Sequence, residues 1–446
     1  MQTEQIQARG KAWQSLQPAL AITSLLVFLF ACALTDKHAA MSAIAGVTAV
    51  LYFASTFAFW SKKSSARSGV IIFLCSMMFL LATNNLKGIA LPAIFSRYFD
   101  VILLLVGIAL LRQVMASLNF TAVLGGYFSR RKTSNMTFGV TLLTAFLTWP
   151  MSLGAISLLL DGLKSVIGPR FNLAKIITRT VCITMVLMPT TIGAAAVWAA
   201  MPDVPHLKAM LVGIPLFLFS ILFNQSAKVT VIAENETVTP SRDGMRYILL
   251  CVGLFWGVFI FSLTVLNLNS LQSIAFTAVV LFVVDHLVKK DKPWAEQLTE
   301  SAQNISGEVL LLLSCSVLTS VCWLLFSHVP EGITAYVGGL TTLQIYAIIL
   351  FIVPLFGLLG IHPLIIFSIA WSIFSDYLTG GMVDYQIWIC LFIATQLISP
   401  VSINAIFAAN SLNVSPSNTS FKMHYGYVLS FNLFALVYLG AMSKII

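Results

Sequence analysis

The chain has 446 residues and a formal net charge of +9, and 59% of its residues are hydrophobic. Only 9% are charged, against about 25% in a soluble domain, which excludes a water-soluble enzyme. The basic residues sit in short clusters between apolar runs, a pattern that indicates membrane topology rather than a nucleic-acid-binding surface.

Continuous apolar runs of about 18 or more residues recur along the chain, and each is long enough to cross a bilayer as a helix. The first, at 18–34, is expected to be a retained helix, because no small-residue cleavage site leads from it into a polar region. Ten further spans are expected at 40–60, 69–83, 100–117, 174–200, 207–224, 246–266, 270–287, 305–327, 384–410 and 424–443. Two more apolar regions, 137–167 and 343–376, each contain a proline between two apolar limbs.

Basic clusters predict the orientation, because Lys and Arg favour the cytoplasmic side of a membrane. The clusters are the head (Arg9, Lys11), Lys62/Lys63/Arg67, Arg130/Arg131/Lys132, Lys164/Arg170/Lys175, Lys228/Arg242/Arg246 and Lys289/Lys290/Lys292. The later clusters agree with the earlier ones only if 137–167 enters and leaves on one side. We therefore expect re-entrant hairpins at 137–167 and 343–376, and about eleven spanning helices. The N-terminus should be cytoplasmic and the C-terminus outside, in the cytoplasmic (inner) membrane.

Two of the expected spans are interrupted near their middle. Pro189 breaks 174–200 and Pro400 breaks 384–410; they follow the hairpin prolines Pro150 and Pro363 by 39 and 37 residues. The chain then divides into a head and first helix (1–39), a first repeat (40–224), a cytoplasmic linker (225–245) and a second repeat (246–446). An odd number of crossings separates the repeats, so their topology should be inverted. Paired proline-interrupted segments in inverted halves indicate the midplane site of a transporter.

The candidate binding residues are the polar and helix-breaking residues at these four places. They are Thr148, Pro150, Ser152, Gly154, Pro189, Thr190, Thr191, Gly193, Gly360, His362, Pro363, Ser399, Pro400, Ser402 and Asn404. Helix N-termini there would favour an anion. Freed carbonyl groups suit a cation, with a possible sodium site at Thr191, Gly193, Ser402 and Asn404. Ser and Thr also commonly re-pair broken backbone in membrane helices, which is the structural alternative.

Several ionisable groups lie within or beside the expected spans. His362 could carry a coupling proton or fix the hairpin tip. Arg179 could extend to the cytoplasmic interface, and Asp161 could face Lys164 or Arg179. His424 was read as interfacial. No acidic residue lies at a hairpin tip or a break, which favours an anionic substrate over a cation/proton antiporter.

Over about 40–443 the chain resembles the ion-transporter superfamily. The residues that carry the resemblance are Ser399-Pro-Val-Ser-Ile-Asn-Ala-Ile-Phe407 and Gly360-Ile-His-Pro363. The superfamily includes divalent-anion/sodium symporters, arsenite permeases, sodium/proton antiporters and membrane subunits of tripartite carboxylate transporters. The resemblance implies a homodimer with a scaffold domain and an elevator-like transport domain that holds both hairpins and both broken helices.

One motif departs from that family. Dicarboxylate symporters carry Ser-Asn-Thr at each hairpin tip, whereas here the single Ser-Asn-Thr, Ser417–Thr419, follows the second broken helix and is expected to be a capping turn.

The expected function is secondary active transport of a small organic anion, with a carboxylate favoured, by alternating access and with coupling to sodium or protons. A cation/proton antiporter or a metalloid-oxyanion permease on the same fold is the nearest alternative. A membrane enzyme acting on lipid-linked substrates is the alternative of another class, but no catalytic constellation is present, so the chain is not expected to be an enzyme. We expect no cofactor beyond a coupling ion and no nucleic-acid partner. A separate binding protein or a small membrane subunit is a possible partner.

Overall fold

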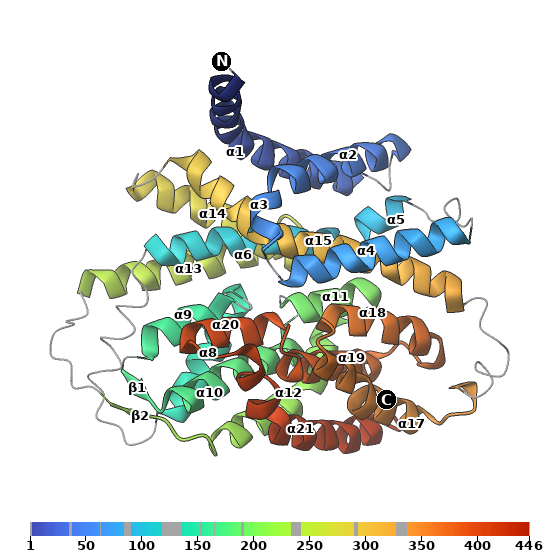
Figure 1. Ribbon diagram of the computed structural model, residues 1–446. Helices are drawn as coiled ribbons and strands as arrows, with labels where there is room; N and C mark the ends of the chain where they lie inside the picture. The colour runs from blue at the N-terminus through green and yellow to red at the C-terminus, as the bar shows by residue number, and fades with distance from the viewer. Residues whose placement is uncertain are drawn as a thin grey trace. The chain divides into compact units, whose positions relative to one another are not determined.

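The fold is described from a computed structural model of the full chain. It describes residues 2–34, 38–62, 64–83, 91–117, 136–151, 154–164, 166–188, 191–232, 242–289, 293–326 and 337–445. Nearly all of these residues are helical (Figure 1). The one sheet in these ranges has two short antiparallel strands, β1 (Ile167–Gly168) and β2 (Thr230–Val231), with Ile167 opposite Val231. The protein is therefore an all-α protein, as expected.

The chain forms two compact units, and each is built from two separate chain segments. Unit 1 comprises Met1–Val114 and Ala275–Val321, and unit 2 comprises Met115–Ile274 and Cys322–Ile446. The chain thus leaves unit 1 after Val114, returns to it at Ala275, and leaves it again after Val321 to end in unit 2.

Unit 1 consists of long apolar helices. These are α1 (Gln2–Leu34), α2 (Ala39–Ser55), α3 (Phe57–Trp60), α4 (Ser64–Ala82), α5 (Leu91–Ser96), most of α6 (Phe99–Ser117), most of α14 (Ser270–Lys289) and most of α15 (Trp294–Phe326). Glycine allows two close approaches: a Cβ at Gly107 would lie 2.8 Å from the Cα of Ala275, and one at Gly69 would lie 3.1 Å from the Cα of Leu311. Small residues at helix crossings are typical of membrane proteins, where close van der Waals packing holds helices together.

Unit 2 contains the interrupted helices. Its first segment carries α8 (Thr137–Met151), α9 (Gly154–Leu163), α10 (Arg170–Ile183), the 3₁₀ turn η2 (Thr184–Val186), α11 (Ile192–Ala200), α12 (His206–Asn224) and α13 (Arg242–Thr264). Its second carries α17 (Thr342–Ala347), the π-helical η3 (Ile348–Ile352), η4 (Val353–Leu359), α18 (Pro363–Phe374), η5 (Ser375–Tyr377), α19 (Met382–Ile398), α20 (Ile403–Leu412), η6 (Pro416–Asn418) and α21 (Phe421–Met442).

Helix α19 forms the core of unit 2. Every residue from Val383 to Ile398 is buried, and α10, α11, α12, α18 and α21 all pack against it. A helix that is buried all round, rather than on one stripe, is the expected centre of a helical bundle.

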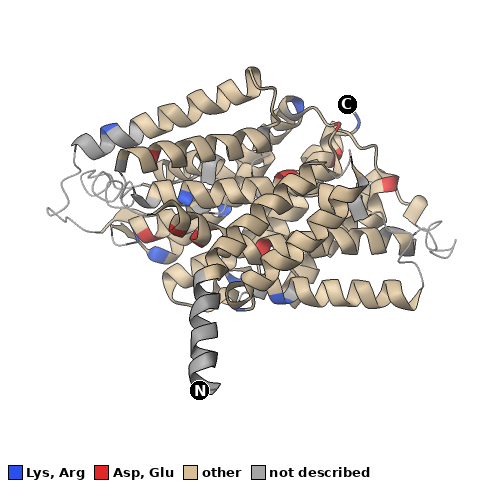
Figure 2. Cartoon of the chain, turned by 90° about the horizontal axis from the view of Figure 1, so that it is seen from above, with Lys and Arg blue, Asp and Glu red and all other residues tan. Residues whose placement is uncertain are grey.

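The described helices have the length and composition of membrane spans. Eight of them are apolar enough to cross a bilayer, and five shorter apolar helices accompany them. Charged positions are few along the helices (Figure 2). On α21, Leu429, Leu433 and Val437 are more than half exposed, and such an apolar face is expected to contact lipid rather than water. The chain is a multi-pass helical membrane protein. The expected eleven crossings and the inverted repeats stay predictions, because helix length and composition do not fix the side on which each end lies.

Candidate functional site

The second broken helix is interrupted where the sequence contains Ser399-Pro-Val-Ser402. Helix α19 ends at Ile398 and α20 begins at Ile403. The Ser402 hydroxyl accepts a hydrogen bond from the backbone N–H of Ala405 (3.2 Å) and donates one to the carbonyl of Gln396 (2.6 Å). It therefore pairs one freed donor and one freed acceptor, one on each side of the break. Pro400 lies between them, at a place where no helical hydrogen bond is required.

The tip of the second hairpin contacts this break. Gly360 has φ +80°, a left-handed conformation that favours glycine. His362 caps α18, because its Nδ1 accepts from the backbone N–H of Leu364 (3.2 Å), and Pro363 follows at the first helical position. The Ser399 hydroxyl donates to the carbonyl of Ile361 (3.1 Å), so the tip and the break are joined directly.

The first broken helix is paired across the core by a residue that sequence reasoning missed. Helix α10 ends at Ile183, and α11 begins at Ile192. The side-chain amide of Gln386 on α19 donates to the carbonyls of Val186 (2.9 Å) and Ala209 (2.6 Å). A Cβ at Gly213 would lie 2.3 Å from the carbonyl oxygen of Val186, so only glycine fits there. The sequence signal that could have identified Gln386 is a glutamine within an apolar run, since such an amide needs a hydrogen-bond partner.

Asn404 links the two breaks. Its side-chain amide nitrogen donates to the sulfur of Cys182, at the end of α10. A Cβ at Gly193, near the start of α11, would lie 3.0 Å from Met185 and 3.1 Å from Phe392 of α19. The half-helices on both sides of the two breaks are thus in contact.

Four buried polar atoms of the residues around the breaks have no hydrogen-bond partner among the described residues: the Oε1 of Gln386 and three atoms near the second break and the tip. These three are the Nε2 of His362, the Oδ1 of Asn404 and the Oε1 of Gln396. Buried polar atoms in proteins are almost always paired, so such atoms indicate a ligand, water or ion. The imidazole nitrogen could donate to a carboxylate when protonated, and the amide oxygens could accept from a hydroxyl or coordinate a cation.

The first hairpin is described in part. The Thr148 hydroxyl is buried and donates to the carbonyl of Thr144 within α8 (2.7 Å), the structural role that serine and threonine often take in membrane helices. Thr191 caps α11 by position, and its hydroxyl reaches the carbonyl of Met188 (3.4 Å). Ser152, Pro189 and Thr190 lie outside the described residues, and Pro150 and Gly154 are placed as backbone only. Convergence of the four prolines stays a prediction.

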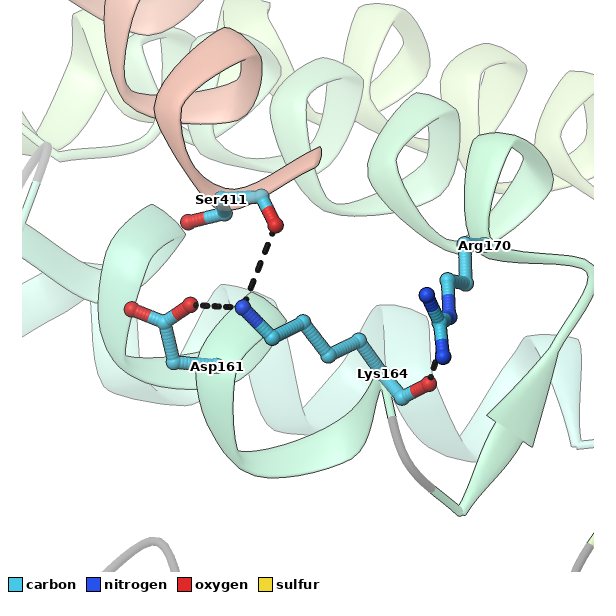
Figure 3. A network of polar contacts seen from close by, with 4 residues as sticks. All are labelled: Asp161, Lys164, Arg170 and Ser411. Atoms are coloured by element: carbon cyan, nitrogen blue, oxygen red, sulfur yellow. Dashed lines mark hydrogen bonds and ion pairs between the residues drawn. The ribbon is translucent and has the colours of Figure 1, made fainter. Parts of the chain in front are cut away.

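The base of the first hairpin is tied to the second broken helix (Figure 3). The Nζ of Lys164 pairs with the carboxylate of Asp161 (2.8 Å) and donates to the carbonyl of Ser411 near the end of α20 (3.1 Å). A cation at a helix C-terminus interacts favourably with its unpaired carbonyls and its dipole. The guanidinium of Arg170 donates to the carbonyl of Lys164 (3.2 Å). Asp161 therefore faces Lys164, one of the two expected partners.

Arg179 is buried between aromatic rings rather than extended to an interface. Its side chain is 4% exposed, and its guanidinium carbon lies 4.8 Å from the ring centre of Tyr427 and 5.4 Å from that of Phe223. The Nε donates to Nδ1 of His424 (3.3 Å). His424 is also buried and contacts Arg179 of α10, and its expected interfacial depth stays a prediction.

Asp384 is a buried carboxylate that sequence reasoning missed. It lies in the first turn of α19 and is 0% exposed. Its oxygens accept from the hydroxyls of Tyr346 (2.5 Å) and Thr379 (2.6 Å). It lies at the opposite end of α19 from the break, which agrees with the absence of acids at the breaks.

The Ser417–Thr419 triplet forms a turn that binds α20. The Thr419 hydroxyl donates to the carbonyl of Ala405 (2.7 Å), and Ser420, the residue before α21, makes no side-chain cap. Across the described ranges, no group of three or more His, Cys, Asp or Glu side chains could hold a metal ion. The sodium site suggested at Thr191, Gly193, Ser402 and Asn404 stays a prediction.

Comparison with known proteins gave no relative. No family model matches the chain, and a search of curated proteins found no match. The resemblance to the ion-transporter superfamily therefore stays a prediction.

Proposed function

We propose that this protein is a secondary transporter that carries a small organic anion, a carboxylate by preference, across the cytoplasmic membrane by alternating access. The observation that supports this most is the contact between two helix breaks and a hairpin tip within unit 2. Ser399 joins the second break to the tip, and Asn404 joins it to the first broken helix. Interrupted helices that meet in a membrane protein are a recurrent way to build a transport site.

The chemistry of this region suits an anion. The short helices α11, α18 and α20 all begin at the breaks or the tip, and the N-terminus of a helix carries the positive end of its dipole. At α18 the first N–H groups already pair with His362, so α11 and α20 are the helices that could offer donors. The side chains nearby are hydroxyls, amides and one imidazole, and the described breaks contain no acid. A negatively charged substrate would therefore meet donors and no repelling carboxylate.

The two compact units fit an elevator-like mechanism. In this proposal unit 2 is the moving part that carries the substrate, and unit 1 is the scaffold through which two copies associate. Coupling to sodium or to protons would supply the driving force.

Uptake into proteoliposomes tests the proposal. The purified protein is reconstituted, and uptake of labelled mono-, di- and tricarboxylates is measured with sodium and proton gradients imposed separately. We expect saturable uptake of at least one carboxylate under one gradient. Saturable uptake of none of them under either gradient would reject the proposal.

A matched pair of variants on α20 tests the site. Asn404→Ala removes a buried amide with an unpaired oxygen, whereas Asn410→Ala removes an exposed amide from the same helix. The unpaired amide oxygen is an acceptor, so it would serve a hydroxyl of the substrate or a coupling cation rather than a carboxylate. Loss of one such contact, about 1.4 kcal/mol, corresponds to about a tenfold loss of affinity, which we expect for Asn404→Ala alone. Equal uptake constants for the two variants would place the substrate elsewhere.

A cation/proton antiporter is the second candidate, and the buried carboxylate of Asp384 is the observation that favours it. It would exchange sodium or potassium against protons in the same proteoliposomes without any carboxylate present. Proton release driven by an imposed sodium gradient would select this function.

A further inference from the structure

Asp384 combines complete burial with a neutral surrounding. It is 0% exposed, on a helix that packs against six other α-helices. Its two carboxylate oxygens accept from Tyr346 and Thr379, at 2.5 and 2.6 Å. A carboxylate removed from water is costly unless a cation compensates it, and acidic residues within membrane segments commonly serve proton movement.

No cation compensates Asp384 among the described residues. The ion pair of Lys164 with Asp161 lies elsewhere in unit 2, at the base of the first hairpin. Other charged or titratable groups on α19 and on the elements around it include Tyr385, Lys208 on α12, Asp376 and Tyr377 in η5, Tyr438 on α21 and Lys444 just after α21. None of them hydrogen-bonds or pairs with Asp384, whose carboxylate is held by hydroxyl groups alone.

Hydroxyl partners allow a carboxyl group to exist in both protonation states. A hydroxyl donates to an ionised carboxylate, and it accepts from a protonated carboxylic acid by rotating its own hydrogen away. A lysine partner can only donate, so an ion pair such as Asp161–Lys164 retains the charged state. The two hydroxyls around Asp384 can therefore hydrogen-bond to both its ionised and its protonated form.

The two hydroxyls differ in their access to solvent. Thr379 is exposed, in the turn at Gly380 and Gly381 that precedes α19, and Gly380 has φ +73°. Tyr346 is buried on α17. A proton from water can be accepted by the Thr379 oxygen while the hydrogen of that hydroxyl passes to Oδ2 of Asp384, which leaves threonine neutral and the carboxyl protonated.

We infer that Asp384 is a proton-binding site. Protons reach it through the Thr379 hydroxyl, and its hydrogen bond with Tyr346 transmits the change of charge to the hairpin. The role of Asp384 in coupling rests on the proposed transport function. Tyr346 belongs to α17, which continues through the π-helical η3 and η4 to the hairpin tip that contacts Ser399. A hydrogen bond to a charged carboxylate is about twice as strong as one to a neutral group. Protonation therefore weakens the link between α19 and the hairpin limb, which gives the proton a route to the candidate site.

Infrared spectroscopy of the full-length protein in lipid nanodiscs tests proton binding without any substrate. We expect a carbonyl stretching band of a protonated carboxylic acid that disappears as the pH is raised. Asp384→Asn removes this band, and Asp376→Asn, which changes an exposed acid eight positions earlier, retains it. Tyr346→Phe retains the carboxyl and removes one hydrogen bond, so the band shifts. A band that survives in Asp384→Asn, or one unmoved by Tyr346→Phe, would overturn the inference.

Transport tests the coupling role separately. In proteoliposomes, Asp384→Asn is expected to lose accumulation driven by a proton gradient and to retain exchange of labelled for unlabelled carboxylate, whereas Asp376→Asn retains both. Proton-driven accumulation by Asp384→Asn equal to that of the unaltered protein would overturn the coupling role. If the unaltered protein takes up no carboxylate under either gradient, the proposed function fails, and the infrared band still decides whether Asp384 binds a proton.

Discussion

Two buried ionisable side chains, Arg179 on α10 and Asp384 on α19, lie toward opposite ends of helix α12, and their surroundings stabilise them in different ways. At its C-terminal end, Phe223 and Tyr427 face the Arg179 guanidinium, and His424 accepts its hydrogen bond. At its N-terminal end, Ala209 is bound by Gln386, two positions beyond Asp384, whose carboxylate is held by hydroxyls. The 19 residues of α12 extend about 28 Å, close to the thickness of a bilayer core.

Neither the Arg179 guanidinium nor the Asp384 carboxylate is hydrogen-bonded to a group of opposite charge. Apolar side chains in place of buried charged groups are often neutral or stabilising. Stability alone therefore does not explain why either group is present. The Arg179 guanidinium contacts aromatic rings and a histidine, and the Asp384 carboxylate accepts hydrogen bonds from hydroxyls. In the proposed orientation, the Arg179 end faces the cytoplasm and the Asp384 end faces outside. Proton binding is inferred for the second alone.

The largest effect on stability is expected at the Asp384 end, from Gln386→Leu. This change leaves the carbonyl of Val186 buried and unpaired and removes a second bond to Ala209, whose carbonyl also lies within helix α12. The unpaired carbonyl costs about 1–3 kcal/mol and the second bond contributes about 1 kcal/mol, so the free energy of unfolding should fall by about 2–4 kcal/mol. Gln225→Leu is the control at the other end of α12, where the amide reaches only Ile221 of its own helix. SDS-titration unfolding in mixed micelles measures both, and equal losses would contradict the account of Gln386.

A smaller effect compares one tyrosine at each end. Tyr346→Phe removes a hydrogen bond to the Asp384 carboxylate, and Tyr427→Phe removes one to the Ser220 hydroxyl (2.7 Å). Hydrogen bonds to charged groups contribute about 1.5–3 kcal/mol and neutral ones about 1 kcal/mol. Unfolding at alkaline pH should therefore show the greater loss for Tyr346→Phe. If Asp384 binds a proton as inferred, the two losses should converge on acidification, and a gap independent of pH would argue for a permanently charged Asp384.

The smallest effect is expected from Arg179→Met. Methionine keeps most of the length and apolar contact between the rings and removes the cost of a buried charge, while the lost cation–π contact costs about 1–2 kcal/mol. These terms oppose each other, so the free energy of unfolding should change by about 1 kcal/mol or less. Uptake measured on the same preparation shows whether the charge serves transport. A large loss of stability would instead make Arg179 a structural clamp between α10, α12 and α21.

The sequence by itself determined the membrane class and the places where helices stop. Ser399-Pro400 and Gly360-Ile-His-Pro363 interrupt helices because proline lacks an N–H and glycine accepts a left-handed backbone. Those preferences act within a few residues, so they are visible in the sequence. The Ser402 and His362 caps follow from the same local chemistry.

Only the tertiary structure decided which side chains complete those interruptions. Gln386 pairs a carbonyl 200 positions away, and Asn404 reaches Cys182 on a different half of the chain. The burial of Asp384 and the aromatic surroundings of Arg179 are decided in the same way. Such contacts depend on how helices pack, and no local preference of the backbone encodes them. A glutamine or an aspartate in an apolar run shows that a partner is needed, and the packing of the helices alone supplies it.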